Sequence, residues 1–169
     1  MLRRCSLLSL PCLVVACGGG GAAGTTPPTT LTARLAAAAV DLGPAVQSAD
    51  IVVQLASSPA EGPSLLEVAI ELPPALTLPA SDRLQAATAL ATLDGDFVGN
   101  RFVVLCGDAQ NPAASTLAVG PLFRLRITPS LPRQVGTFTV RLHNLRAATR
   151  TGQPVPVETS PTVVDVTVR

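Results

Sequence analysis

The segment Leu66-Glu67-Val68-Ala69-Ile70-Glu71-Leu72 decides the fold class of this 169-residue chain. Its large apolar side chains recur at every second position, with Glu67, Ala69 and Glu71 between them. Because successive side chains of a β-strand point to opposite faces, this alternation predicts a strand with one face in a core and one in water. Similar alternation is present at 50–55, 123–128, 137–143 and 164–168, and 101–106 is apolar on both faces, as expected of a central strand.

The segments between these runs are rich in turn-forming residues, such as Pro73-Pro74, Asp94-Gly95, Gly120-Pro121 and Gly152. Strands that recur about every 10 to 15 residues, without strand–helix–strand alternation, predict an all-β fold, an antiparallel two-sheet β-sandwich. Two Ala-rich segments, Leu31 to Val40 and Leu84 to Leu93, stay open between strand and helix because alanine favours helix.

The charge balance argues against nucleic acid as a partner. The chain has 12 basic side chains, all of them arginine, and a formal net charge of +1. Since no block of basic residues is present, the electrostatic term that drives binding to phosphate backbones is missing.

The N-terminus has the features of an export signal. Met1 to Arg4 carries two arginines, Ser6 to Ala16 is apolar, and the stretch ends at Cys17. About ten apolar residues are too few for a transmembrane helix. Val14-Val15-Ala16-Cys17 resembles a bacterial lipobox, which implies a signal peptide at 1–16 and diacylation of Cys17. An ordinary secretory signal with an incidental cysteine is the alternative, and Cys12, which follows a proline, is a poorer lipidation candidate.

Residues 17–30 are expected to form the lipidated cysteine and a flexible tether. The sequence GGGGAAGTTPPTT at 18–30 has no large apolar side chain to offset the entropy of ordering it. The remaining residues, 31–169, are predicted to form one domain. After removal of the signal and acylation of Cys17, Cys106 is the only free thiol, and its place at the end of an apolar run favours a buried position over a redox or metal role.

Seven segments of the chain follow one another in an order that is similar to a known family. They are 50–55, 65–78, 99–105, 120–125, 136–142, 146–157 and 163–168. In this order they resemble a cohesin domain, a jelly-roll sandwich that shares its fold with certain carbohydrate-binding modules, and 50–55 is similar to the first cohesin strand. Leu72-Pro73-Pro74 stands where cohesins usually have an aromatic residue, Asp and Pro. The resemblance spans Ala49 to Arg169 and implies a non-catalytic module that recognises a protein, such as a dockerin module on a secreted polysaccharide-degrading enzyme.

The candidates for catalysis or metal binding are weak. His143 is the only histidine, sits on the polar side of its strand, and no serine lies in a G-x-S-x-G motif. Glu67 and Glu71 lie four apart on a strand, about 13 Å, too far for paired-carboxylate hydrolysis. Asp94-Gly95-Asp96 reads as a hairpin turn. We therefore expect no enzyme, no cofactor and no metal site. The twelve-residue calcium-loop pattern is absent, but the carboxylates of Asp94 and Asp96 leave Ca²⁺ binding open.

The polar sides of two predicted strands offer a possible partner-binding face. It consists of Arg124, Arg126, Arg141 and His143, provided that the two strands share a sheet. Arginine binds carboxylates in bidentate geometry, so the patch would suit an acidic partner, whereas a merely solvated face is the alternative.

The function expected from the sequence is a membrane-anchored display module for a protein partner. A carbohydrate-binding module is one alternative, although the chain lacks the Trp and Tyr that usually grip sugars. A structural envelope lipoprotein is another. Gly18 after Cys17 favours an outer-membrane or cell-surface location over retention at the inner membrane.

Overall fold

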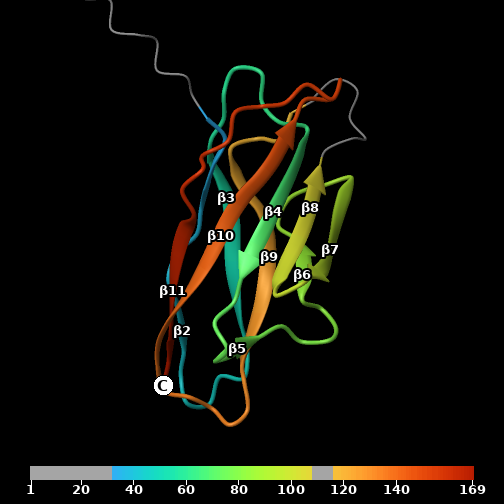
Figure 1. Ribbon diagram of the computed structural model, residues 1–169. Helices are drawn as coiled ribbons and strands as arrows, with labels where there is room; N and C mark the ends of the chain where they lie inside the picture. Colours follow the sequence, from blue (N-terminus) through green and yellow to red (C-terminus); the bar gives the residue numbers. More distant parts are fainter. Residues whose placement is uncertain (1–31, 108–115) are drawn as a thin grey trace, which may run out of the picture.

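The computed structural model describes residues 32–107 and 116–169, which form a β-sandwich (Figure 1). Every regular element in these residues is a strand, as the sequence predicts. No helix in the described part of the chain is long and apolar enough to cross a membrane. The strands are β1 (Arg34–Ala36), β2 (Val40–Leu42), β3 (Ala49–Ser57), β4 (Leu65–Glu71), β5 (Leu76–Thr77), β6 (Leu84–Ala86), β7 (Thr92–Val98), β8 (Arg101–Gly107), β9 (Gly120–Pro129), β10 (Gly136–Ala148) and β11 (Thr162–Val168).

The strands form two packed sheets. The five-stranded sheet has the order β1-β3-β9-β5, with β6 also pairing with β9, and the six-stranded sheet has the order β2-β11-β10-β4-β8-β7. In Figure 1, β10, β4 and β8 lie in front of β3 and β9. All pairs are antiparallel except β2 with β11, which is parallel. The predicted two-sheet sandwich is therefore confirmed.

The two Ala-rich segments contain strands. Leu31 to Val40 includes β1 and the start of β2, and Leu84 to Leu93 includes β6 and the start of β7. Two short strands thus precede β3, which the family resemblance had placed first. Pairing of β1 with β3 and of β6 with β9 supplies the hydrogen bonds of these short strands, and this tertiary context overrides the helix preference of alanine.

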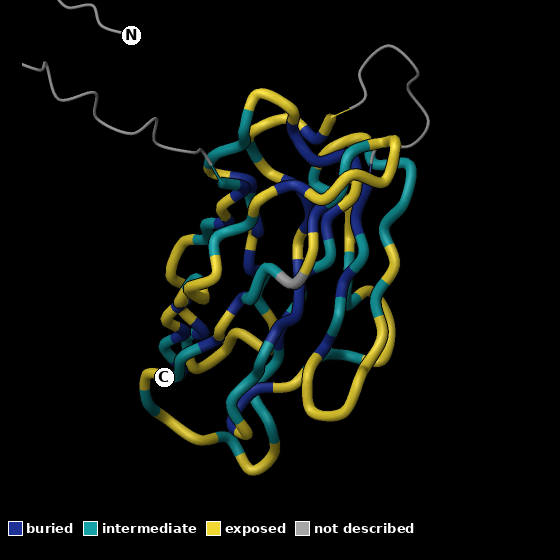
Figure 2. Tube along the Cα trace, turned by 45° about the horizontal axis from the view of Figure 1, so that its top comes forward, coloured by how far each residue is buried: buried dark blue, intermediate teal, exposed yellow. Residues whose placement is uncertain are grey.

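The core lies between the sheets and contains the predicted apolar positions. Phe102 of β8 and Phe123 of β9 are fully buried and face it from opposite sheets. Figure 2 shows buried positions along the central strands and exposed residues in the loops. Cys106 is also buried, as predicted, and burial raises the pKa of its thiol to about 12. The thiol therefore stays protonated at physiological pH.

The prediction of a hairpin turn at Asp94-Gly95-Asp96 is wrong, because these residues lie in the middle of β7. The turn follows at Gly99, whose φ of 63° favours glycine. Glycine is needed at position 95 for a different reason, because a Cβ there would lie 2.6 Å from Cζ of Phe102, which is too close for two carbon atoms. Gly120-Pro121, also read as a turn, begins β9.

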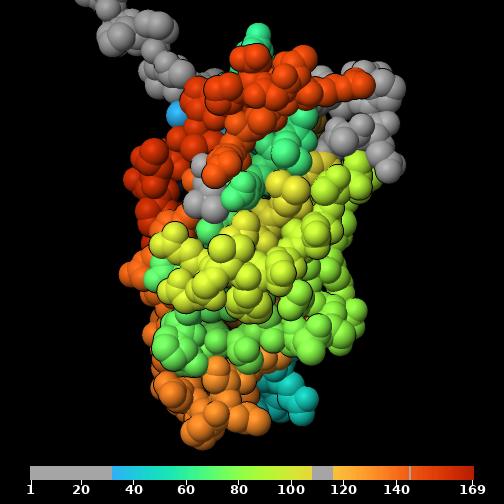
Figure 3. Space-filling model, turned by 45° about the vertical axis from the view of Figure 1, so that its right-hand side comes forward, coloured from blue at the N-terminus to red at the C-terminus, as the bar shows by residue number. Residues whose placement is uncertain are grey.

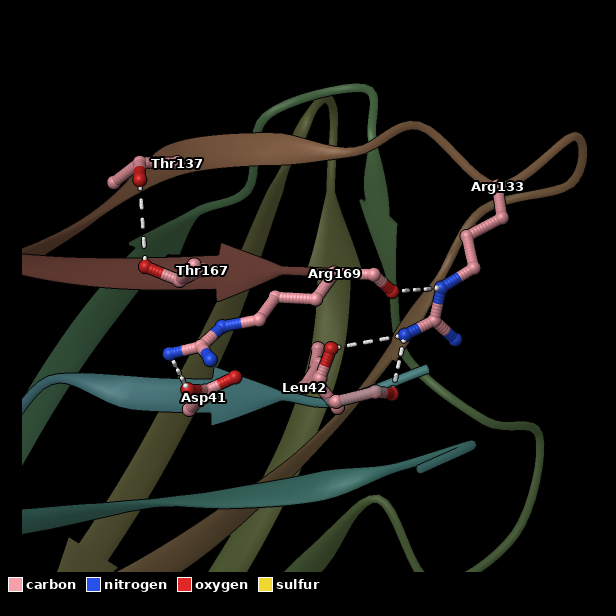
Figure 4. Close-up of polar contacts among 7 residues, drawn as sticks. Asp41, Leu42, Arg133, Thr137, Thr167 and Arg169 are labelled. Atoms are coloured by element: carbon pink, nitrogen blue, oxygen red, sulfur yellow. Dashed lines mark hydrogen bonds and ion pairs between the residues drawn. The ribbon is translucent and has the colours of Figure 1, made fainter. Parts of the chain in front are cut away.

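Arg133 links several segments at one end of the sandwich through hydrogen bonds (Figure 4). It lies in the loop between β9 and β10, and its guanidinium donates hydrogen bonds to four backbone carbonyls. The acceptors are Arg169 (3.0 Å), Val46 (3.1 Å), Leu42 (2.9 Å) and Gly43 (2.6 Å). One side chain therefore joins the β9–β10 loop, the β2–β3 loop and the residue after β11.

Candidate functional site

The four residues of the predicted partner-binding face do not lie together. Arg124 and Arg126 are on β9 of the five-stranded sheet, whereas Arg141 and His143 are on β10 of the six-stranded sheet. The condition that these strands share a sheet is therefore not met. Alternation fixes which side of its strand a residue occupies but carries no information on which sheet the strand joins.

The outer face of the five-stranded sheet is largely polar and has one ion pair among the described residues. Asp50 and Val52 of β3 lie opposite Arg126 and Arg124 of β9. The guanidinium of Arg126 donates a hydrogen bond to Asp50 at 3.0 Å, and this bond and the charge of Asp50 raise the pKa of Arg126. Both members of this central pair are partly buried.

The outer face of the six-stranded sheet, named here the open face, has a different pattern. Three rows of residues lie directly opposite each other across β10, β4, β8 and β7 at its middle, and the residues between them on β4 and β8 are buried in the core. The rows are Arg146-Glu67-Leu105-Asp94, His143-Ala69-Val103-Asp96 and Arg141-Glu71-Arg101-Val98.

The charges of β10 and β4 on the open face pair with each other. Glu71 lies 3.3 Å from Nε2 of His143 and 3.8 Å from Arg141. Glu67 lies 3.9 Å from Arg146, whose side chain is 84% exposed, so this contact is loose. His143 is thus on the outward side of its strand, as predicted, but it contacts a carboxylate. Glu67 and Glu71 have cationic neighbours and do not form a carboxylate pair.

The β7 side of the open face carries carboxylates without cationic partners among the described residues. Asp94 and Asp96 each accept a hydrogen bond of 2.8 Å from the backbone N–H of the following residue, and neither forms an ion pair there. The described residues include no group of three or more acidic, histidine or cysteine side chains placed to hold a metal ion.

A shallow hollow lies between these carboxylates and β4, named here the Leu105 hollow. It has a volume of about 270 Å³, and its lining is mainly apolar. Figure 3 turns this side of the molecule toward the reader, with atoms of β7 and β8 in lime and yellow across its middle. The lining residues are Glu67, Asp94, Gly95, Asp96, Val98, Val103 and Leu105.

A second hollow, of about 410 Å³, is lined mostly by polar residues at 60–64, 116 and 149–153. Its threonine hydroxyls are engaged locally. Thr149 lies 3.0 Å from the hydroxyl of Thr151 and accepts a hydrogen bond of 3.1 Å from the backbone N–H of Gln153. These contacts stabilise the turn at 149–153.

The open face was missed in the sequence, although one signal for it was present. Residues 101–106 are apolar on both sides, and the structure places Val103 and Leu105 outward, half-buried, on a central strand. Apolar side chains on the outer side of an interior strand form an apolar patch when their neighbours on adjacent strands are also apolar. Cys17 and the tether at 17–30 lie outside the described residues.

Comparisons with known proteins agree on the fold. No protein-family model and no curated sequence matches the chain. Among solved structures, the cohesin of the OlpA–Doc918 cohesin–dockerin complex from Clostridium thermocellum matches with a TM-score of 0.64 and 14% identity, over 82% of this chain and 99% of that one. The sixth cohesin of scaffoldin B from Acetivibrio cellulolyticus, in complex with a Cel5 dockerin, gives the same values.

A third cohesin is described as non-cellulosomal and comes from the archaeon Archaeoglobus fulgidus. It matches with a TM-score of 0.59 and 15% identity, over 83% of this chain and 91% of that one. At such identities the likeness establishes the fold. The chain has the cohesin fold, and the expected cohesin-like sandwich is confirmed.

Proposed function

We propose that this protein is a non-catalytic binding module that recognises another protein through its open face. The observation that carries the proposal is the cohesin fold, because the solved structures that share it include cohesins in complex with dockerins. A dockerin-like module of a secreted enzyme is accordingly the proposed partner.

The composition of the open face supports this choice of surface. Its centre holds the half-buried Val103 and Leu105, and charged side chains surround them. An apolar centre with a polar rim is the usual anatomy of a protein–protein interface. The exposed apolar residues Leu65, Val98 and Val163 extend this character to neighbouring strands of the same sheet.

We further propose that the module is exported and held at an outer membrane or cell surface by a lipid on Cys17. Support comes from the N-terminal sequence, in which an arginine-bearing start, an apolar segment and a lipobox-like ending precede a glycine-rich spacer. In Figure 1 the chain enters β1 near one end of the sandwich, while the open face runs along its side. An anchor at that end leaves the open face accessible.

The test uses the chain from residue 18 onward, which keeps every described strand, as bait for proteins secreted by the same organism. Capture is measured with Ca²⁺ and then with chelator, because dockerins of the related systems require calcium to fold. The decisive variant is Leu105→Asp on the open face, and its matched control is Val52→Asp on the outer face of the five-stranded sheet.

We expect one or a few proteins to be captured specifically, and capture to fall at least tenfold with Leu105→Asp and less than twofold with Val52→Asp. A charge at the centre of an interface is costly because it is desolvated without a partner. Equal losses for both variants, or capture of a polysaccharide instead of a protein, would contradict the proposal.

A further inference from the structure

We propose that the partner places one cationic side chain with an apolar stem, an arginine or a lysine, in the Leu105 hollow. The stem packs on Val103 and Leu105, and the cationic head meets Glu67, Asp94 and Asp96. This inference rests on the proposed function and specifies the chemistry that the open face selects.

The strand register places the three carboxylates around an apolar floor. Glu67, Leu105 and Asp94 lie directly opposite one another on β4, β8 and β7. Since neighbouring strands are about 4.8 Å apart, the backbones of the two acidic residues are separated by about 10 Å, with the leucine between them. Asp96 adds a third carboxylate in the next row, opposite Val103. An extended arginine or lysine side chain spans a space of this size.

The charges around the Leu105 hollow favour a cationic occupant. Asp94 and Asp96 have no ion pair among the described residues, and Glu67 has only its loose contact with Arg146. Arg101, the cation of β8, lies in the row of Glu71 and Val98 and is absent from the lining of the hollow. The hollow therefore carries a local excess of negative charge.

The apolar floor distinguishes this occupant from a simple cation. An ammonium or metal ion would meet the carboxylates but leave Val103 and Leu105 in contact with water, whereas the methylene stem of a side chain covers them. The lining is mainly apolar, so a ligand that carries both a cationic head and an apolar stem matches it best. Arginine adds bidentate hydrogen bonding to carboxylates.

The first test needs no partner and uses n-butylguanidinium as the probe, with n-pentylammonium as the lysine analogue. Amide chemical shifts of the chain from residue 18 onward are recorded by NMR during titration. We expect saturable shifts at Gly95, Val103 and Leu105, with a Kd at least fivefold lower than for guanidinium or n-butanol. n-Butyrate should produce no shifts there. Equal effects of n-butyrate and n-butylguanidinium would overturn the inference.

The same double variant, Asp94→Asn with Asp96→Asn, is used in the probe titration and in binding to the captured partner. The control is Asp165→Asn. Asp165 is an exposed carboxylate on β11 of the same sheet, outside the hollow, where it accepts a hydrogen bond of 3.4 Å from Thr139. We expect the double variant to weaken probe binding at least fivefold and the control to leave it within twofold. Binding that persists in the double variant would contradict the assignment.

Binding to the captured partner separates the failure of this inference from the failure of the proposed function. If Leu105→Asp abolishes partner binding while the double variant keeps the Kd within twofold, the cationic occupant is excluded and the binding function stands. If the probe binds in the hollow but no protein is captured, the proposed function fails and the site remains. Loss of at least tenfold in partner affinity with the double variant supports both.

Discussion

The two outer faces of the sandwich differ in which side chains lie opposite one another on their interior strands. On the five-stranded sheet, Asp50 and Arg126 lie opposite each other on the interior strands β3 and β9 and form a 3.0 Å ion pair. On the six-stranded sheet, the centre is Val103 and Leu105, and the carboxylates beside them have no cationic partner among the described residues. The proposed role of the second face follows from this difference, because a partner that covered it would remove Val103 and Leu105 from water.

This difference arises although the inner faces are equivalent. Each sheet contributes one fully buried phenylalanine and a set of aliphatic side chains to a shared core. Both sheets therefore contribute to stability, whereas the recognition that we propose involves only the outer face of the six-stranded sheet. Substitutions on the inner and outer faces distinguish these two contributions.

The largest effect is expected for truncation of the core, and it should be equal for the two sheets. Phe102→Ala and Phe123→Ala each remove a fully buried ring and leave a cavity, so each should lower the free energy of unfolding by about 3 to 5 kcal/mol. Urea denaturation measures both. A loss below about 1 kcal/mol for either variant would show that its sheet contributes little to the core.

The next effect is a pH dependence that only the inner face of the six-stranded sheet should produce. Burial raises the pKa of Cys106 from the ordinary value of 9.0 to about 12, so above pH 9 the unfolded chain loses a proton that the folded chain keeps. The stability that this thiol contributes is complete below pH 9 and is lost as the pH rises toward 12, at about 1.4 kcal/mol per pH unit.

Few other groups interfere in this pH window, because the chain has no lysine and no tyrosine and Cys106 is the single cysteine after residue 18. Denaturation at pH 8 to 11 measures the slope. Cys106→Ala should lose it, and a slope that persists in this variant would assign the pH dependence to another group.

A smaller loss is expected at the end where both sheets meet. Arg133→Met keeps most of the stem but removes the hydrogen bonds to four carbonyls, and should lower the free energy of unfolding by about 1 to 3 kcal/mol. Arg124→Met is the control, because Arg124 is exposed on β9, and it should change stability by less than about 0.5 kcal/mol. Thermal melts suffice, and equal shifts would contradict a special role for Arg133.

The smallest changes in the free energy of unfolding are expected when one carboxylate on each outer face is neutralised. Asp50→Asn breaks the pair with Arg126 and should cost up to about 1 kcal/mol. Asp96→Asn removes a charge without a described cationic partner, next to Asp94 on the same side of β7, and should be neutral or stabilising by a few tenths of a kcal/mol. If Asp96→Asn were the more destabilising change, the contrast between the faces would fail.

Much of the fold was predictable because long strands with one buried side show alternating apolar and polar residues in the sequence. The alternation at β4 and β10 identifies both the strand and the side that faces the core. The short strands β1 and β6 carry no such signal, since they form only because β3 and β9 offer hydrogen-bonding edges. Gly95 was misread for a similar reason, because the close approach of the Phe102 ring that requires glycine is a tertiary contact.

The candidate site was less predictable than the fold. The sequence showed that Arg124, Arg126, Arg141 and His143 point to the polar sides of their strands, but the assignment of β9 and β10 to different sheets separates them. The open face depends on four strands that are distant in the sequence and become neighbours only through pairing. Its one local signal was the apolar outer side of 101–106.

The parallel pairing of β2 with β11 has a consequence for how the chain folds. It joins Val40 to Val166, about 125 residues apart, and contacts between such distant residues form slowly because a long loop must be closed first. The short strand β2 is therefore synthesised early but can pair in the six-stranded sheet only after β11 has been added. Among the described strands, the edge at β2 is completed last, although it lies near the start of the sequence.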